Sequence, residues 1–178
     1  MARIGRIVVP GFPHHVTQRG NRRQPVFFEP SDCQLYRDLL AEHCRRASVE
    51  VWAYCLMPNH VHLVLTPRTP HALARAIGET HRQYTAFINA RARWTGHLFQ
   101  GRFSSVALDE AHLAAAARYV ALNPVRAKLA ARAQVHSVFR RSGNRFAAEN
   151  ASKEIMRPGR APAPISRDAM TAWCAWRR

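Results

Sequence analysis

Acidic residues, paired cysteines and long apolar runs are all scarce in this 178-residue sequence. No apolar run approaches the roughly 20 residues that a membrane-spanning helix needs, and the apolar stretch near the N-terminus is too short for a secretory signal. The four cysteines form no CxxC pair, which excludes a zinc-finger pattern and favours reduced, packed thiols. We therefore expect a soluble, cytoplasmic protein without structural disulfides.

Positive charge is abundant. Only 11 Asp and Glu stand against 27 Lys and Arg, so the formal net charge is +16. Almost all of these cations are Arg, whose planar guanidinium pairs with phosphate and stacks on bases. This balance indicates a polyanionic partner, with nucleic acid ahead of a membrane surface. The 47% hydrophobic content predicts one globular domain rather than a disordered chain.

Hydrophobic periodicity predicts the element order β-α-β-β-α-β-α. We expect Ser31 to cap the first helix and Pro124 to disrupt the last one or begin a new turn. The order fits a ferredoxin-like α+β sandwich: a four-stranded antiparallel sheet with helices on one face, plus a helix after the last strand. The expected strands are 14–20, 49–57, 60–66 and 103–108, and the expected helices are 31–48, 70–93 and a third from 109 onward.

The domain is expected to end near residue 134. Residues 135–178 are polar and basic, are interrupted by Gly and Pro, and show no sustained periodicity. We therefore divide the chain into a folded domain at 1–134 and a loosely ordered tail at 135–178.

Two histidines occupy the stretch "MPNHVHLVLTP" at 57–67. Alternation along a strand sends His60 and His62 to one face and Val61 and Leu63 to the other. Two neutral imidazoles at this spacing suit a divalent cation, and a bound phosphate would supply the missing anionic ligands. The alternative is an ordinary polar strand surface.

A candidate nucleophile lies in "ARYVALNPVRAKL". Tyr119 and Asn123 are four positions apart and share one helical face, so a phenol lies beside an amide ligand. A tyrosine that attacks a phosphodiester conserves the bond energy, which suits strand breakage and rejoining. The alternatives are that Tyr119 is a packed core aromatic and that Tyr84 is the nucleophile.

Three motifs in order, "MPNHVHLVLTP", "RQYTAFINARARWTGHLFQGRFSSV" and "ARYVALNPVRAKL", resemble the single-tyrosine HUH transposase family, most closely its REP-associated tyrosine transposases. The likeness covers about residues 1–130. It implies cleavage of single-stranded DNA, at hairpin or repeated palindromic elements, through a 5′-phosphotyrosine with a free 3′-hydroxyl. By position, His60 and His62 match the ligands of a Mg²⁺ or Mn²⁺ ion, Tyr119 matches the nucleophile, and Asn123 matches a residue that holds or orients the metal.

The expected partner is therefore single-stranded or hairpin DNA, with nucleoid association when bound. The resemblance leaves monomer and homodimer undecided. A hairpin-binding or single-stranded-DNA-binding protein without catalysis is the main alternative, and an RNA-binding ferredoxin-like domain is a weaker one because such a sheet presents aromatics. Trp94 and Phe99 are candidates for base stacking, and the candidate DNA contacts are Arg22, Arg23, Arg82, Arg91, Arg93 and Arg102.

Overall fold

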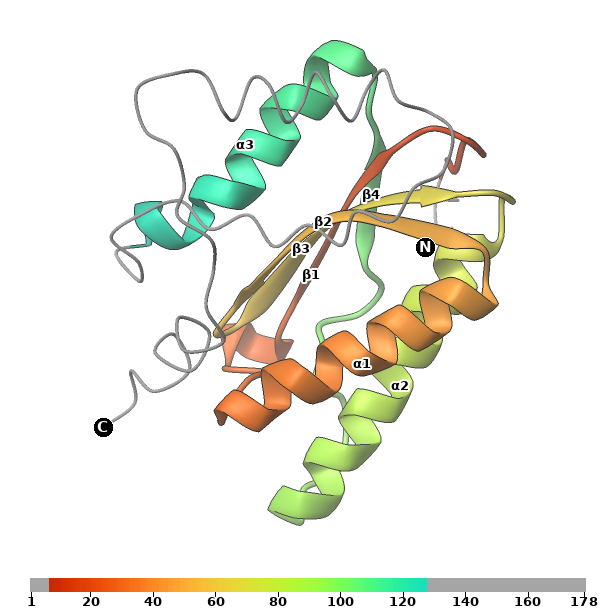
Figure 1. Ribbon diagram of the computed structural model, residues 1–178. Coiled ribbons are helices and arrows are strands. Elements are labelled where there is room, and N and C mark those ends of the chain that lie inside the picture. The colour runs from red at the N-terminus through yellow and green to blue at the C-terminus, as the bar shows by residue number, and fades with distance from the viewer. Residues whose placement is uncertain (1–6, 128–178) are drawn as a thin grey trace, which may run out of the picture.

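One four-stranded antiparallel sheet organises residues 7–127, the part of the chain that the computed structural model describes (Figure 1). The predicted tail at 135–178 lies outside the described residues. Within them, no helix is both long and apolar enough to cross a bilayer. In chain order the elements are β1 (His14–Arg19), the 3-10 turn η1 (Asn21–Arg23), α1 (Pro30–Arg46), β2 (Val49–Met57), β3 (His60–Pro67), α2 (Ala72–Ala92), β4 (Ser104–Ala107) and α3 (Glu110–Arg126).

The strand order is β2-β3-β1-β4, so β1 and β3 are the two central strands. Helices α1 and α2 cover one face of the sheet, and α3 crosses the other (Figure 1). This arrangement confirms the ferredoxin-like α+β prediction, and the predicted element order is confirmed as well. Among the described residues, α3 is therefore the only helix on the face that α1 and α2 leave uncovered.

Strand β3 contributes to two different cores. Val61, Leu63 and Leu65 pack into the larger cluster beneath α1 and α2, whereas Val64 packs into a smaller cluster beneath α3. His60 and His62 share the parity of Val64, so both project toward α3. This confirms that the two histidines occupy the face opposite Val61 and Leu63.

Helix α1 begins differently from the prediction. Glu29 rather than Ser31 is the N-cap, with Pro30 in the first turn. The buried carboxylate of Asp32 accepts the backbone N–H groups of Phe28 (2.8 Å) and Glu29 (3.0 Å), which completes a capping box. Ser31 was the wrong cap because Asp32, one residue further on, is the side chain that reaches back to those free amides.

Helix α3 continues through Pro124 to Arg126, so the prediction that Pro124 would disrupt the helix is wrong. The N-terminus agrees with expectation, because the side chain of Asp109 caps the helix by accepting from the backbone of His112 (2.8 Å). Pro124 is buried. Packing against the rest of the molecule offsets the backbone hydrogen bond that a proline removes.

The buried ion pair between α1 and α2 generates a stability prediction. The guanidinium of Arg91 on α2 donates two hydrogen bonds, of 2.7 and 2.9 Å, to the fully buried carboxylate of Asp32. Asp32→Ala leaves two backbone amides without an acceptor and leaves Arg91 with Glu29 (3.3 Å) as its remaining ion pair, so we expect a loss of about 3–5 kcal/mol in the free energy of unfolding, measured by urea titration. Asp38→Ala, an exposed change on the same helix, should alter it by less than about 0.5 kcal/mol; equal losses in the two variants would contradict this account.

A histidine on α2 generates a pH prediction. Nε2 of His81 accepts from the hydroxyl of Tyr36 (2.9 Å), and burial lowers the pKa of His81 from 6.5 to about 3. Its contribution to stability is therefore complete above pH 6.5 and declines as the pH falls toward 3, by up to about 1.4 kcal/mol per pH unit. His81→Gln keeps an acceptor for Tyr36 but does not titrate. The free energy of unfolding should fall between pH 7.5 and pH 5 in the parent, and this fall should be up to about 2 kcal/mol smaller in His81→Gln. Parallel pH profiles of the two proteins would refute the prediction.

Candidate active site

Three histidines gather on the sheet face beneath α3. His60 and His62 come from β3, and their ring centroids are 4.9 Å apart. The central pairing of β1 with β3 adds His15, whose Nε2 lies 3.1 Å from Nδ1 of His62. The sheet therefore presents a cluster of three imidazoles where the sequence predicted a pair.

Helix α3 brings Tyr119 over these imidazoles, and Asn123 lies one turn further along the same face of the helix. Small and apolar residues, Leu113, Ala116 and Val120, recur along one stripe of α3 and pack on the sheet. The ring of Tyr119 lies 5.4 Å from that of His62 and 6.1 Å from that of His15, centroid to centroid, while 40% of the residue remains exposed. Tyr119 is thus neither a buried core aromatic nor remote from the histidines.

The rival nucleophile, Tyr84, lies on the opposite side of the sheet. It is fully buried in the cluster beneath α1 and α2, and its hydroxyl donates to the carbonyl of Val26 (2.7 Å). Burial raises the pKa of Tyr84 far above its usual range. A substrate phosphate has no access to this hydroxyl, so the geometry leaves Tyr119 as the tyrosine of the site.

Burial keeps the imidazoles of the cluster neutral. Burial, together with smaller effects of charge repulsion from His60, His15 and Arg19, lowers the pKa of His62 to about 3. Burial also lowers the pKa of His60, with a smaller effect from Arg19, and that of His15. Neutral imidazoles have a free nitrogen lone pair, which is the form that binds a metal ion.

The residues present fit a divalent cation. Nε2 of His62 and the amide nitrogen Nδ2 of Asn123 are buried without a hydrogen-bond partner among residues 7–127. The two amide atoms of an asparagine are distinguished only by their partners, so the carbonyl oxygen of Asn123 can take the unpartnered position. The described residues hold no cluster of three or more His, Cys, Asp or Glu arranged to bind a metal. A cation here therefore needs His60, His62, Asn123 and oxygens from a substrate phosphate or water.

The loop after β1 braces the histidine end of β3. The backbone N–H of Gly20 donates to the carbonyl of Asn59 (2.8 Å), and Nδ2 of Asn59 donates to the carbonyl of Arg23 (3.1 Å). Oδ1 of Asn59 then accepts from Nδ1 of His60 (2.6 Å). The backbone of the loop that carries Arg22 and Arg23 is therefore held beside Asn59, the neighbour of His60.

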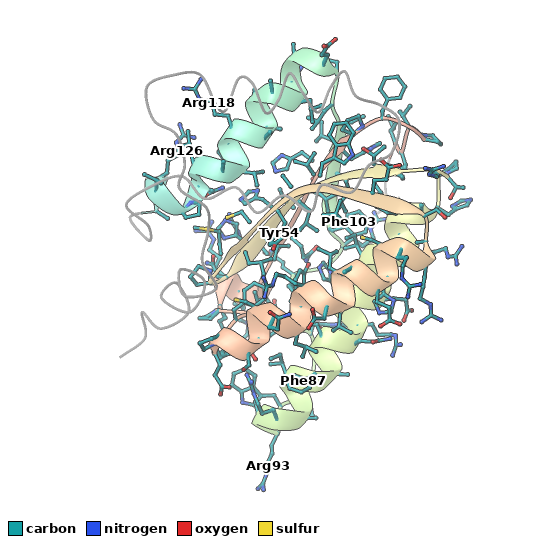
Figure 2. All side chains as sticks on the ribbon, viewed as in Figure 1. Tyr54, Phe87, Arg93, Phe103, Arg118 and Arg126 are labelled. Atoms are coloured by element: carbon teal, nitrogen blue, oxygen red, sulfur yellow. The ribbon has the colours of Figure 1, made fainter. Side chains whose placement is uncertain are left out.

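Three of the other four arginines selected from the sequence lie away from the histidine cluster. Arg82 and Arg91 belong to α2, on the far side of the sheet from α3, where Arg82 pairs with Glu79 and Arg91 with Asp32. Figure 2 shows Arg93 projecting from the C-terminal end of α2, away from the sheet. Arg102 lies in the loop before β4. The structure does not gather Arg82, Arg91 and Arg93 around the histidines, and the DNA contacts of all four arginines remain predictions.

The two aromatic residues proposed for base stacking differ in their exposure. Trp94 is 52% exposed and has an edge contact with Phe28 (5.5 Å between ring centroids). Phe99 is buried in the larger core and stacks on His81 (4.2 Å), so the expectation that it stacks on bases is wrong. Its neighbours in sequence are polar and glycine-rich, which concealed its burial.

Sequence reasoning missed His15, Arg19 and Arg126. His15 alternates with the core residue Val16, and that alternation was the available signal that it faces the second side of the sheet. Arg19 ends the same strand and lowers the pKa of His60 and His62. The guanidinium of Arg126 lies 5.6 Å from the ring centroid of Tyr119; it was concealed because Pro124 was expected to disrupt the helix.

A His-hydrophobic-His pair on a ferredoxin-like sheet faces a helix-borne tyrosine, which is the arrangement that the resemblance to single-tyrosine HUH transposases implied. Residues 9–123 match the family model described as transposase, IS200 like. The chain belongs to the IS200-like transposase family, which confirms the resemblance found in the sequence motifs.

Two solved structures are similar to this chain, and the first of them supports the fold. One, a REP-associated tyrosine transposase bound to a REP hairpin, is similar to this chain with a TM-score of 0.58 and 21% identity, over 71% of this chain and 74% of that one. Another, a protein assigned as a transposase from Deinococcus radiodurans R1, has a TM-score of 0.47 and 24% identity, over 67% and 95% of the two chains. The comparison with curated proteins found no match.

Close packing at Gly20 generates a prediction about the loop. A Cβ at this position would lie 2.2 Å from the carbonyl oxygen of Gln24 and 2.8 Å from Val26, so the backbone must move. We expect Gly20→Ala to lower the free energy of unfolding by about 1–3 kcal/mol and to displace the loop that braces Asn59. Gly78→Ala is the matched control on the exposed side of α2, where an added Cβ has open space, and it should raise stability by about 0.5–1 kcal/mol. Thermal unfolding of both variants measures the contrast, which fails if Gly20→Ala is as stable as the parent.

Proposed function

We propose that the protein is a metal-dependent endonuclease and strand-transferase that acts on single-stranded or hairpin DNA through a 5′-phosphotyrosine intermediate. One observation carries the proposal: the partly exposed ring of Tyr119 packs against His62, an imidazole with a buried, unpartnered Nε2. The candidate nucleophile therefore lies beside an imidazole whose Nε2 has no hydrogen-bond partner among residues 7–127. Membership in a transposase family supports the same chemistry.

Tyr119 is the proposed nucleophile. Its hydroxyl oxygen forms a bond to the phosphorus of a phosphodiester, and the bond from that phosphorus to the 3′ oxygen breaks. The departing 3′ oxygen takes up the proton of the phenol, so the strand on the 5′ side leaves with a free 3′-hydroxyl. The 5′ phosphate stays on Tyr119. Because the bond energy is conserved in the phosphotyrosine, a second 3′-hydroxyl can attack it and rejoin the strands.

The protein's own residues place the phosphate. His60, His62 and Asn123 would hold Mg²⁺ or Mn²⁺, which polarises the scissile phosphate when bound. Arg126 lies over the Tyr119 ring, where its charge favours the developing phenolate and attracts the phosphate. The low pKa of His62 makes its imidazole a weak base, so His62 stays neutral and does not take up the phenolic proton.

The DNA partner is inferred from charge and likeness. The loop with Arg22 and Arg23 lies next to the histidines and has no acidic partner among the ion pairs of residues 7–127. The similar REP-associated tyrosine transposase was solved with a REP hairpin. We propose that a hairpin, or its single-stranded flank, approaches this end of the sheet, with phosphates on the loop and the scissile bond under α3.

A binding protein without catalysis is the second candidate. The net charge of +16 and the basic loop are sufficient for salt-sensitive DNA binding whether or not Tyr119 reacts. This alternative needs no metal and forms no covalent product. A test for a covalent protein–DNA product therefore distinguishes the two candidate functions.

A labelled single-stranded hairpin incubated with the protein and Mn²⁺ should yield a denaturation-resistant protein–DNA adduct. Tyr119→Phe removes only the attacking oxygen and should abolish the adduct while it leaves hairpin binding within about threefold, since the phenol contributes little to phosphate affinity. Adduct is measured by denaturing electrophoresis, and binding by mobility shift.

Tyr84→Phe is the matched control. It loses the bond to Val26, worth about 1 kcal/mol of stability, but should retain adduct formation. A hairpin that binds the parent without forming an adduct at any Mn²⁺ or Mg²⁺ concentration supports the binding protein. An adduct that persists in Tyr119→Phe refutes the assignment of the nucleophile.

A further inference from the structure

We propose that His15 is a positioning residue that holds His62 in the Nδ1–H tautomer and so directs the Nε2 lone pair of His62 toward the metal position. This deepens the proposed function and rests on it for the role of the metal. The hydrogen bond itself is a property of the metal-free protein. Nothing in the sequence motifs assigns a role to His15.

The tautomer of His60 is set by its neighbours. Nδ2 of Asn59 donates to the carbonyl of Arg23, which can only accept, so Oδ1 of Asn59 must be the atom that faces His60. A carbonyl oxygen only accepts, so Nδ1 of His60 carries the proton and Nε2 carries the lone pair. His60 therefore presents Nε2 for coordination without any change of tautomer.

His62 lacks an acceptor of that kind. Nδ1 of His62 faces only Nε2 of His15 at 3.1 Å, and its Nε2 is buried with no partner in the described part of the chain. If His15 donated this bond, the proton of His62 would be forced onto Nε2, where it would be buried, unbonded and unable to bind a metal. The arrangement that leaves no buried N–H unpaired has His62 donating and His15 accepting.

His15 is suited to accept. The planes of the His15 and His62 rings are inclined by only 20° and their centroids lie 5.3 Å apart. Since the two facing nitrogens are 3.1 Å apart, the rings meet at their nitrogen-bearing edges. Burial lowers the pKa of His15, which favours the neutral ring that has a lone pair to offer. The β1–β3 register fixes the two rings, since His15 pairs with Val64, two residues from His62. A metal-binding histidine whose other nitrogen is held in this way keeps both its tautomer and its orientation.

The first test uses the metal-free protein labelled with ¹⁵N-histidine. A long-range ¹H–¹⁵N spectrum distinguishes the two tautomers of each neutral imidazole. We expect His62 as the Nδ1–H form in the parent and in His15→Gln, whose amide oxygen can accept near the position of Nε2. In His15→Phe, which keeps a ring but loses the acceptor, we expect the Nε2–H form. His62 found as the Nε2–H form in the parent overturns the inference, and no variant has to fold for that result.

The second test measures Mn²⁺ binding by calorimetry, with no DNA present. Removal of a residue that orients a metal ligand typically costs 10–100-fold in affinity, so His15→Phe should weaken binding by about that factor and His15→Gln should recover most of it. A merely structural role for the ring predicts the reverse order, since Phe preserves the ring and Gln does not. His112→Phe, an exposed histidine of α3 paired with Asp109, is the control and should bind as the parent does.

The outcomes separate the two levels of the proposal. Mn²⁺ binding that is lost in His62→Ala but unchanged in His15→Phe overturns the role of His15 and leaves the metal site standing. A parent that binds no Mn²⁺ overturns both the metal site and the role of His15.

Discussion

The antiparallel pairing of β1 with β3 is the constraint on which both faces of the molecule depend. In the observed register Thr17 lies opposite His62 and Val16 opposite Leu63, so Val16 joins the core beneath α1 and α2 while His15 joins His60 and His62 on the other face. A slip of one residue would exchange the two faces of β1, bury His15 beneath α1 and α2, and turn Val16 toward α3. The hydrophobic core beneath α1 and α2 therefore stabilises the register that assembles the histidine cluster, although it contributes no atom to the site.

Helix α3 converts that histidine face into a site with a nucleophile. Its packing stripe is built largely of small residues such as Ala116, which lets the helix lie close to the sheet and brings Tyr119 against His62. The helix does not stop at Pro124, and the extra turn puts Arg126 over the Tyr119 ring. The phenol is thus placed by tertiary packing on one side and faced by a cation on the other, while part of it remains open to a substrate.

The positive charge of the chain serves two purposes. Arg91 holds α1 and α2 together through the buried Asp32, and exposed arginines such as Arg82 pair with acidic neighbours on their own helix, where they contribute little to stability. Because acidic residues are few, other guanidiniums remain without ion pairs in the described part of the chain, among them Arg19, Arg22 and Arg23 at the histidine end of the sheet. A phosphate backbone arriving at that end meets cations that the fold has not already neutralised.

Local pattern was enough to predict the elements, their order, the ferredoxin-like architecture and the shared face of His60 and His62, because strand alternation and helical spacing are properties of neighbouring residues. Three predictions made from neighbouring residues alone were wrong: the helix cap at Ser31, the helix disruption at Pro124 and the exposure of Phe99. Each depends on contacts that are not visible in the local sequence pattern. Only the tertiary structure decided that His15 joins His62, that Tyr84 is enclosed while Tyr119 is accessible, and that Arg91 is committed to Asp32. The physical reason is that burial and hydrogen-bond partners are set by contacts between residues far apart in the chain, and the sequence does not display those contacts.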